Sequence, residues 1–251
     1  MNDELEPVLS NEPETAPWQA LREFTAARIA LGRAGTSLPT REVLRFNQAH
    51  AAARDAVWTP ADFGPLRASW PDAPEIRSQA DTRAEYLRRP DLGRSLHPDS
   101  RILLETLNAP APKLLIVVGD GLSAAALAHA PALLHSLLPL LAEMRVQLLF
   151  AQQCRVALAD EAGEMLNARA SLIILGERPG LSSADSLGAY LTFAPRVGKQ
   201  DSERNCVSNI RPGGLEMTDA ARRLAFLVRE SLRRELSGVA LKDESGRRLE
   251  D

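Results

Sequence analysis

Glu177 and Arg178 follow directly on an apolar run in the segment LIILGERPG. A run rich in Ile and Leu that ends at glycine predicts a strand buried on both faces of a parallel sheet. Pro179 disfavours a helical conformation at Arg178, so both charged side chains should stand on an extended loop. Ligands of open α/β sheets bind at the carboxyl ends of the strands. We therefore predict a ligand-binding loop here, with a local ion pair between Glu177 and Arg178 as the alternative.

The segment VVGDGLSA contains the pattern G-x-G-x-x-A at Gly119, Gly121 and Ala124, between a predicted strand and a predicted helix. Such glycines let a pyrophosphate approach a helix N-terminus. The full dinucleotide fingerprint also requires an acidic residue about 20 positions later, at the end of the next strand. This chain has Gln152 and Gln153 there. The sequence therefore predicts a tight turn and disfavours NAD binding, while a stand-alone NAD(P)-binding oxidoreductase stays an alternative function.

No set of side chains forms a complete catalytic or metal site by its spacing. Ser123 lies outside any G-x-S-x-G motif and is expected to cap a helix. Cys154 and Cys206 lack C-x-x-C spacing, and the histidines are not at ligand spacing. Cys206 belongs to NCVSNIRPGG, which is either a glycine-rich turn or a ligand loop at the same edge as Glu177. We predict a chain that contributes binding surface, with no catalytic residue and no metal ligand of its own.

The predicted structure differs between three parts of the chain, and these parts must position the loops. Residues 1–17 contain five acids, three prolines and no Lys or Arg, and predict a disordered acidic lead-in rather than a signal peptide. Residues 18–110 predict a helical and irregular N-terminal region, with helices from Trp18 and from Thr40 to Val57. In residues 111–251, apolar strands alternate with helices. We expect an α/β fold, with a Rossmann-like, mostly parallel sheet flanked by helices and joined to the helical N-terminal region.

The composition is that of an ordinary soluble protein, with 45% hydrophobic and 25% charged residues. A net charge of −3 gives no reason to expect a nucleic acid or an anionic membrane as a partner. No apolar stretch is expected to span a membrane. These features predict a cytoplasmic protein.

Six segments, taken in order, resemble the small subunit of ethanolamine ammonia-lyase, a family of adenosylcobalamin enzymes. They are ARIALGRAG, LRFNQAHAAARDAV, YLRRPDLGR, VVGDGLS, LGERPGL and NCVSNIRPGG, within the span from about Arg28 to Val239. Several dispersed motifs in one order are more specific than any single glycine loop. The resemblance implies a two-subunit enzyme that converts ethanolamine to acetaldehyde and ammonia.

The resemblance also implies how the work is divided between the subunits. The large subunit would be a (β/α)8 barrel that binds ethanolamine and carries the catalytic side chains. The small subunit would close over the corrinoid within a higher hetero-oligomer, and cobalt–carbon homolysis would supply the adenosyl radical.

Three positions match the family's small-subunit cobalamin contacts: Val156, Glu177 and Cys206. The resemblance implies that Glu177 accepts hydrogen bonds from the corrinoid periphery or its nucleotide tail. Val156 would give apolar contact. Cys206 would make a close-packed or backbone contact and would not act as a reactive thiol.

The histidines bear on how the cobalt is held. Cobalamin enzymes that replace the lower axial base use a histidine in an Asp-x-His-x-x-Gly motif, and none of the four histidines here has Asp two residues before it. The cofactor should therefore keep its own dimethylbenzimidazole on cobalt, with no cobalt ligand from this chain.

Two further alternatives concern location and role. The acidic, proline-broken N-terminus lacks the amphipathic helix that docks cargo on a microcompartment shell. A free cytoplasmic complex is therefore expected, and enclosure in a bacterial microcompartment is the alternative. A non-catalytic adaptor subunit without cofactor contact is the remaining functional alternative.

Overall fold

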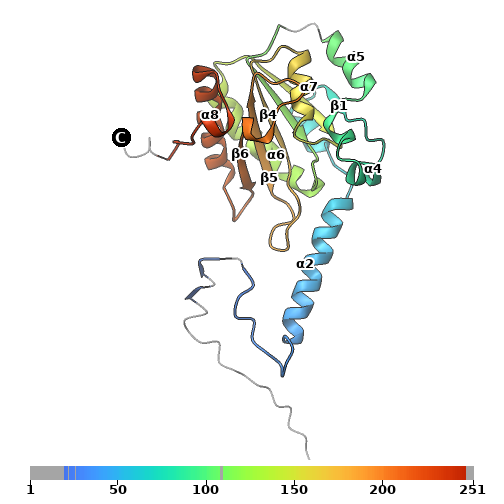
Figure 1. The fold of residues 1–251 in the computed structure, drawn as a ribbon, viewed down its shortest axis with the longest axis vertical. Helices are drawn as coiled ribbons and strands as arrows, with labels where there is room; N and C mark the ends of the chain where they lie inside the picture. Colours follow the sequence, from blue (N-terminus) through green and yellow to red (C-terminus); the bar gives the residue numbers. More distant parts are fainter. Residues whose placement is uncertain (1–19, 22, 26, 108–109, 247–251) are drawn as a thin grey trace, which may run out of the picture.

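The computed structural model describes residues 20–21, 23–25, 27–107 and 110–246, which form an α/β body from which one long helix projects (Figure 1). The predicted acidic lead-in, residues 1–17, lies outside the described residues. The body is built around one six-stranded sheet with the strand order β1-β3-β2-β4-β5-β6. The strands are β1 (Glu75–Arg77), β2 (Leu114–Gly119), β3 (Val146–Gln152), β4 (Ala170–Gly176), β5 (Leu187–Phe193) and β6 (Arg204–Ile210).

The direction of the strands corrects the expectation of a mostly parallel sheet. Strands β1, β3, β2 and β4 pair in parallel, but β5 pairs antiparallel with β4 and β6 pairs antiparallel with β5. The sheet is therefore mixed. The physical reason is the short connection between β4 and β5, which turns the chain straight back on itself instead of crossing over through a helix.

The apolar runs of the sequence become strands buried on both faces. Every residue of β2 and β4 is buried. In β2, Leu114 and Ile116 pack into one core, whereas Leu115 and Val117 pack into the other. Successive side chains point to opposite faces, so a continuous apolar run serves both cores.

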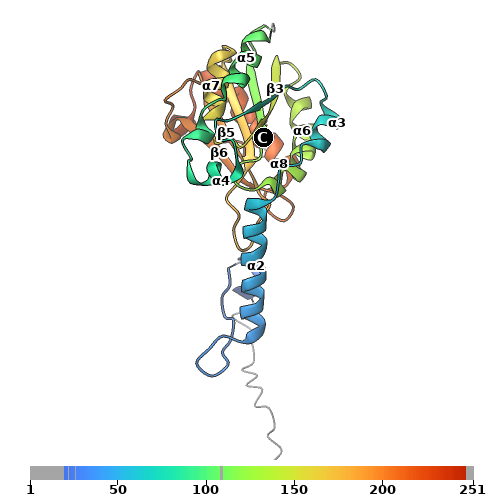
Figure 2. The same cartoon turned by 90° about the vertical axis from the view of Figure 1, so that its right-hand side faces the viewer.

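Helices cover both faces of this sheet, as expected. Figure 2 shows α6 and α8 on one side and α7 on the other. The helices of the body are α3 (Gly64–Ser69), α4 (Arg83–Arg88), α5 (Pro98–Thr106), α6 (Ala130–Leu137), α7 (Leu158–Met165) and α8 (Met217–Arg234), with short 3-10 turns η1 (Leu92–Arg94), η2 (Ala124–His129), η3 (Leu138–Leu141), η4 (Asp201–Glu203) and η5 (Gly238–Ala240).

No apolar stretch was expected to be long enough to span a membrane, but one stretch of the body is. Ala124–Leu141 is long and apolar enough to cross a membrane, by length and composition only, with a mean hydropathy of 1.5 over 18 residues. It folds as η2, α6 and η3. Leu133, Leu134 and Leu141 in this stretch are fully buried in the core that also contains residues of α8. Its hydrophobicity is thus used in packing against the sheet and α8.

Several local predictions are confirmed and others are wrong. Helix α2 (Thr40–Trp58) begins at the predicted residue and ends one residue later than predicted. The helix predicted from Trp18 starts outside the described residues. Between Phe24 and the start of α2, none of the described residues is helical. Two strands were not predicted: β1, which has only three residues, and β6.

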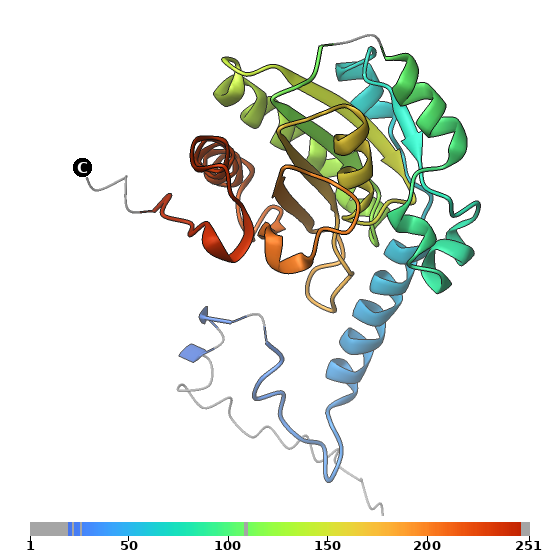
Figure 3. The same cartoon turned by 45° about the horizontal axis from the view of Figure 1, so that its top comes forward.

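Helix α2 stands away from the body. It projects below the sheet in two views at right angles (Figures 1 and 2). Of its 19 residues, only Glu42 and Ala56 are buried. Its far end carries the preceding segment, residues 27–39, and Arg28 in that segment reaches the body by donating to the carbonyl of Leu181 at 3.4 Å. Figure 3 shows α2 leaving the body beside α4.

Candidate functional site

The carboxyl ends of β2, β3 and β4 meet at one edge of the sheet, and an open hollow of about 490 Å³ lies there. It brings together two of the three predicted contact residues, Val156 after β3 and Glu177 after β4. The hollow is lined by Tyr86, Gly121, Leu122, Cys154, Arg155, Val156, Leu175, Gly176, Glu177, Arg178 and Tyr190. We call this cavity the edge hollow.

Glycines allow the loops at this edge to pack against each other. Gly121 has a φ of +53°, and a Cβ on it would overlap the carbonyl oxygen of Gly176. A Cβ on Gly176 would in turn overlap the carbonyl oxygen of Ser123. The amide of Leu122 donates to the carbonyl of Gly176 at 2.8 Å, which ties the two loops together. The glycines of VVGDGLSA thus serve the predicted tight turn and its contact with the loop after β4.

Ser123 does not cap a helix as predicted. Its hydroxyl donates instead to the carbonyl of Ala184 at 2.6 Å, in the loop after β4, and makes no cap hydrogen bond to η2. The element that follows the turn is a 3-10 turn and not an α-helix. The geometry that would present a helix N-terminus to a pyrophosphate is therefore not formed at this turn.

Glu177 is held by residues from two other segments. Its Oε2 atom accepts hydrogen bonds from the hydroxyl of Ser186 at 2.8 Å and from the backbone N–H of Asn209 at 3.1 Å. The alternative of a local ion pair with Arg178 is wrong, because no such pair forms between these two described side chains. Glu177 is half-buried, and Oε1 has no hydrogen-bond partner among the described residues. That oxygen can accept from a donor in the edge hollow.

Cys206 was expected in a loop at the carboxyl end of a strand. It is instead the third residue of β6. It pairs with Tyr190 of β5. Tyr190, but not Cys206, lines the edge hollow. Burial raises the pKa of the Cys206 thiol, as does the nearby Glu177 carboxylate. A thiol with a raised pKa is a poor nucleophile at neutral pH.

Two arginines lie over the ring of Tyr86 in the wall of the edge hollow. The guanidinium carbons of Arg83 and Arg155 are 4.8 and 4.4 Å from the ring centroid. Such cation–π contacts add stability where the cation is shielded from water. The hydroxyl of Tyr86 donates to the carbonyl of Cys154 at 2.9 Å, so this wall is fixed to the end of β3.

Arg83 connects three segments behind the hollow. Its guanidinium donates to Asp120 at 3.2 Å, to the carbonyl of Gly121 at 2.8 Å and to the carbonyl of Val57 in α2 at 2.8 Å. Asp120 is 4% exposed, and burial raises the pKa of its carboxyl to about 6 in spite of Arg83. Helix α2 is therefore joined to the same turn that shapes the edge hollow.

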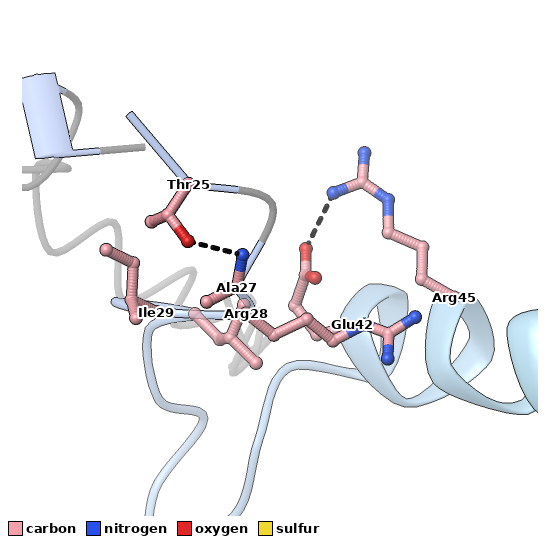
Figure 4. A pocket seen from close by; sticks show the side chains of 7 residues that line it. Thr25, Ala27, Arg28, Ile29, Glu42 and Arg45 are labelled. Atoms are coloured by element: carbon pink, nitrogen blue, oxygen red, sulfur yellow. Dashed lines mark hydrogen bonds and ion pairs between the residues drawn. The ribbon is translucent and has the colours of Figure 1, made fainter. Parts of the chain in front are cut away.

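A second hollow lies between α2 and the preceding segment. Figure 4 shows its lining side chains, with Glu42 directed toward Arg45. The Glu42 carboxylate accepts from Arg41 at 3.0 Å and from Arg45 at 2.9 Å. Both guanidinium partners neutralise the only carboxylate in the lining, and none of the predicted contact residues belongs to this lining. The edge hollow is therefore the candidate site.

The lining of the edge hollow offers several kinds of group that can recognise a ligand. It offers apolar surface from Val156 and Leu175, an acceptor at Glu177 and two cations, Arg155 and Arg178. The thiol of Cys154, at its base, is fully buried and has a raised pKa because of burial. These features define an α/β protein with an open hollow at its strand ends, whose lining is partly polar and partly apolar.

Comparison with known proteins identifies the family. The family model for ethanolamine ammonia-lyase light chain (EutC) matches residues 15–242. The chain is 52% identical over 244 residues to the ethanolamine ammonia-lyase small subunit of Bradyrhizobium diazoefficiens, covering 92% of each chain. It is also 52% identical over 242 residues to the small subunit from Azotobacter vinelandii, covering 91% of this chain and 89% of the relative.

The chain belongs to the ethanolamine ammonia-lyase light-chain family, and it is a small subunit of a lyase. The family predicted from the six dispersed motifs is thereby confirmed.

Sequence analysis missed several residues of this site, among them Tyr86, Arg155 and Tyr190. Arg155 directly precedes Val156 after β3, so its position at a strand end was a usable signal. Tyr86 opens the YLRRPDLGR motif, but nothing in that motif indicates that it reaches the end of β3.

Proposed function

We propose that this chain is the small subunit of an adenosylcobalamin-dependent ethanolamine ammonia-lyase, which converts ethanolamine to acetaldehyde and ammonia together with a (β/α)8-barrel large subunit. The observation that carries the proposal is the placement of Val156 and Glu177 in one hollow at the carboxyl edge of the sheet, within a chain of this family. Val156, Glu177 and Cys206 are the proposed contact residues for the cofactor.

The chemistry of the edge hollow suits one side of a corrinoid. The periphery of a corrinoid carries amide groups, whose N–H groups match the acceptor Oε1 of Glu177. Val156 and Leu175 offer apolar surface to its methyl groups and to the benzimidazole. Cys206, which pairs with Tyr190 of the lining, would make a close-packed or backbone contact with the cofactor. We propose that the cofactor stays base-on, with no cobalt ligand from this chain.

When bound, adenosylcobalamin supplies the radical by cobalt–carbon homolysis, and the protein contributes position and electrostatics. In this chain, Glu177 would orient the corrinoid edge, and Val156 with Leu175 would exclude water from it. The catalytic side chains would come from the large subunit. We propose that residues 111–251 form a Rossmann-like domain and that this domain contacts the cofactor.

We further propose that α2 and the edge hollow face the same large subunit. Helix α2 exposes Leu44, Phe46 and Trp58 by 62%, 44% and 52%. A helix with so little packing on its own chain draws its stability from a surface that covers it. Arg83 joins the end of α2 to the turn beside the edge hollow, so a partner that covers the cofactor also meets the base of α2. We propose a higher hetero-oligomer in the cytoplasm, with enclosure in a microcompartment as the alternative.

The test is ammonia release from ethanolamine and adenosylcobalamin, with this chain co-expressed with its matching large subunit and each subunit alone as the control. Activity from the pair alone is the expected result. Activity from the large subunit alone would support a non-catalytic adaptor. A well-formed but inactive pair that instead binds NAD(P) would support the oxidoreductase alternative.

A further inference from the structure

Arg155 occupies a fixed place in the wall of the edge hollow. Its backbone N–H donates to the carbonyl of Gly93 at 2.7 Å, and its guanidinium lies over Tyr86. A Cβ on Gly93 would come within 2.8 Å of both the Arg155 side chain and the Tyr86 ring. Only glycine leaves room for this packing. The position of the cation is therefore set before any ligand arrives.

The charge of Arg155 is not neutralised within the described part of the chain. None of its atoms lies within ion-pair distance of a described carboxylate. Its Nη2 donates to the carbonyl of Tyr86 over a long 3.4 Å, and its Nε has no hydrogen-bond partner. Arg83, which lies over the same ring, does have a carboxylate partner, Asp120. Two arginines thus share one aromatic ring, and only one of them is paired.

An unpaired guanidinium in a half-buried wall favours an anionic ligand. A buried donor without a partner destabilises the structure that holds it, and hydrogen bonds between a guanidinium and a phosphate are among the strongest in proteins. The second cation of the lining, Arg178, is exposed on the extended loop and is not held in this way. Within the hollow, Arg155 is the preorganised anion-binding group.

We propose that Arg155 binds the phosphodiester of the corrinoid's nucleotide tail and so selects complete cobalamins over corrinoids that lack this phosphate. The inference rests on the proposed function. It assigns the nucleotide tail to the β3 side of the edge hollow, beside Tyr86, and leaves Glu177 on the β4 side for the amides of the corrinoid periphery.

The experiment measures corrinoid affinity in the complex of this chain with its large subunit. The three probes are adenosylcobalamin, adenosylcobinamide phosphate and adenosylcobinamide, the last of which lacks the phosphate. Arg155→Gln should weaken the first two about tenfold or more, because a charged hydrogen bond is lost. It should leave the affinity for adenosylcobinamide unchanged. The matched control is Arg196→Gln, at an exposed arginine after β5 that does not line the edge hollow, and it should change none of the three.

Two further measurements separate phosphate binding from a structural role. Arg155→Lys keeps the charge but loses the planar fork, so it should recover part of the selectivity. The wild-type affinity for adenosylcobalamin should fall as salt rises, more steeply than that of Arg155→Gln. Inorganic phosphate should compete with adenosylcobinamide phosphate for the wild-type complex and should not compete with adenosylcobinamide.

Several results would overturn the inference. If Arg155→Gln weakened all three corrinoids equally, Arg155 would only support the Tyr86 wall. If it weakened none, the phosphate would be bound elsewhere. If the wild-type complex bound adenosylcobinamide as tightly as adenosylcobinamide phosphate, the proposed function would stand and the role of Arg155 would be refuted. A complex that binds no corrinoid would refute the proposed function itself.

Discussion

The backbone N–H of Asn209 donates a hydrogen bond to Oε2 of Glu177, with 3.1 Å between nitrogen and oxygen. This contact joins the end of β6 to the loop after β4, 32 residues away in the sequence. The same oxygen also accepts from Ser186, so the carboxylate has a structural role on one oxygen. A ligand role for the other oxygen can be separated from it by comparing two substitutions.

Glu177→Ala should weaken binding of adenosylcobalamin to the complex by about 1.5–3 kcal/mol, because a charged acceptor is removed. Glu177→Gln keeps an oxygen acceptor and should cost less. Equilibrium titration of the corrinoid into the two variant complexes measures the difference. Unchanged affinity in Glu177→Ala would refute the contact and support the adaptor alternative.

The buried ion pair between Asp160 of α7 and Arg204 of β6 should be sensitive to the loss of either partner. Its two contacts are 2.7 and 2.6 Å long, and both side chains are at most 4% exposed. Arg204→Met leaves Asp160 charged and unpaired, and should lower the free energy of unfolding by about 3–5 kcal/mol. Urea denaturation measures this. The double variant Asp160→Leu with Arg204→Met should be closer to wild type, and equal losses in both would contradict the argument.

Asp120 should make stability depend on pH in a defined direction. Burial raises the pKa of this carboxyl from 3.8 to about 6, so the folded state binds a proton more tightly than the unfolded state. The contribution of Asp120 to the free energy of unfolding is therefore largest below pH 3.8 and is lost as the pH rises through 6. Between pH 5 and pH 7.5 the free energy of unfolding should fall by about 1 kcal/mol more in the wild type than in Asp120→Asn. Parallel pH profiles from urea denaturation would show that Asp120 does not titrate in this range.

Gly176→Ala should disrupt the edge hollow. The added Cβ would overlap the backbone oxygen of Ser123 and lie 2.8 Å from that of Asp120, so the two loops must move apart. We expect a loss of about 2 kcal/mol or more in stability, together with weaker corrinoid binding. The control is Gly180→Ala in the same loop, where the nearest atom to the new Cβ is 3.5 Å away. Equal stability of the two variants would contradict the close approach.

Leu44→Glu on α2 should weaken assembly with the large subunit without unfolding the body. Leu44 is 62% exposed and lies near the N-terminus of α2, so a charge there costs little in the free chain. Buried in an interface, the same charge would be desolvated and unpaired. Co-purification with a tagged large subunit, followed by a titration, measures the change. The matched control is Ile102→Glu on α5, which is 60% exposed. A loss of assembly in the control alone would assign the interface to that side of the body.

The sequence by itself determined the buried strands β2 and β4, the glycine turn after β2 and the loop position of Glu177. These features depend on local patterns: an apolar run, a glycine that adopts a positive φ, and a proline that extends the residue before it. The dispersed motifs determined the family, because their order is a property of the sequence alone.

Only the tertiary structure decided which residues share the edge hollow. Strand β6 was missed because it is an edge strand whose few apolar residues are interrupted by polar ones, such as Asn205, Ser208 and Asn209, so its hydrophobic pattern is weak. Tyr86 and Arg155 are 69 residues apart and meet only when α4 packs beside the end of β3. Local propensity carries no information about such a contact, because its free energy comes from burial between segments distant in the chain. The pairing of Arg83, but not Arg155, with a carboxylate follows from that packing.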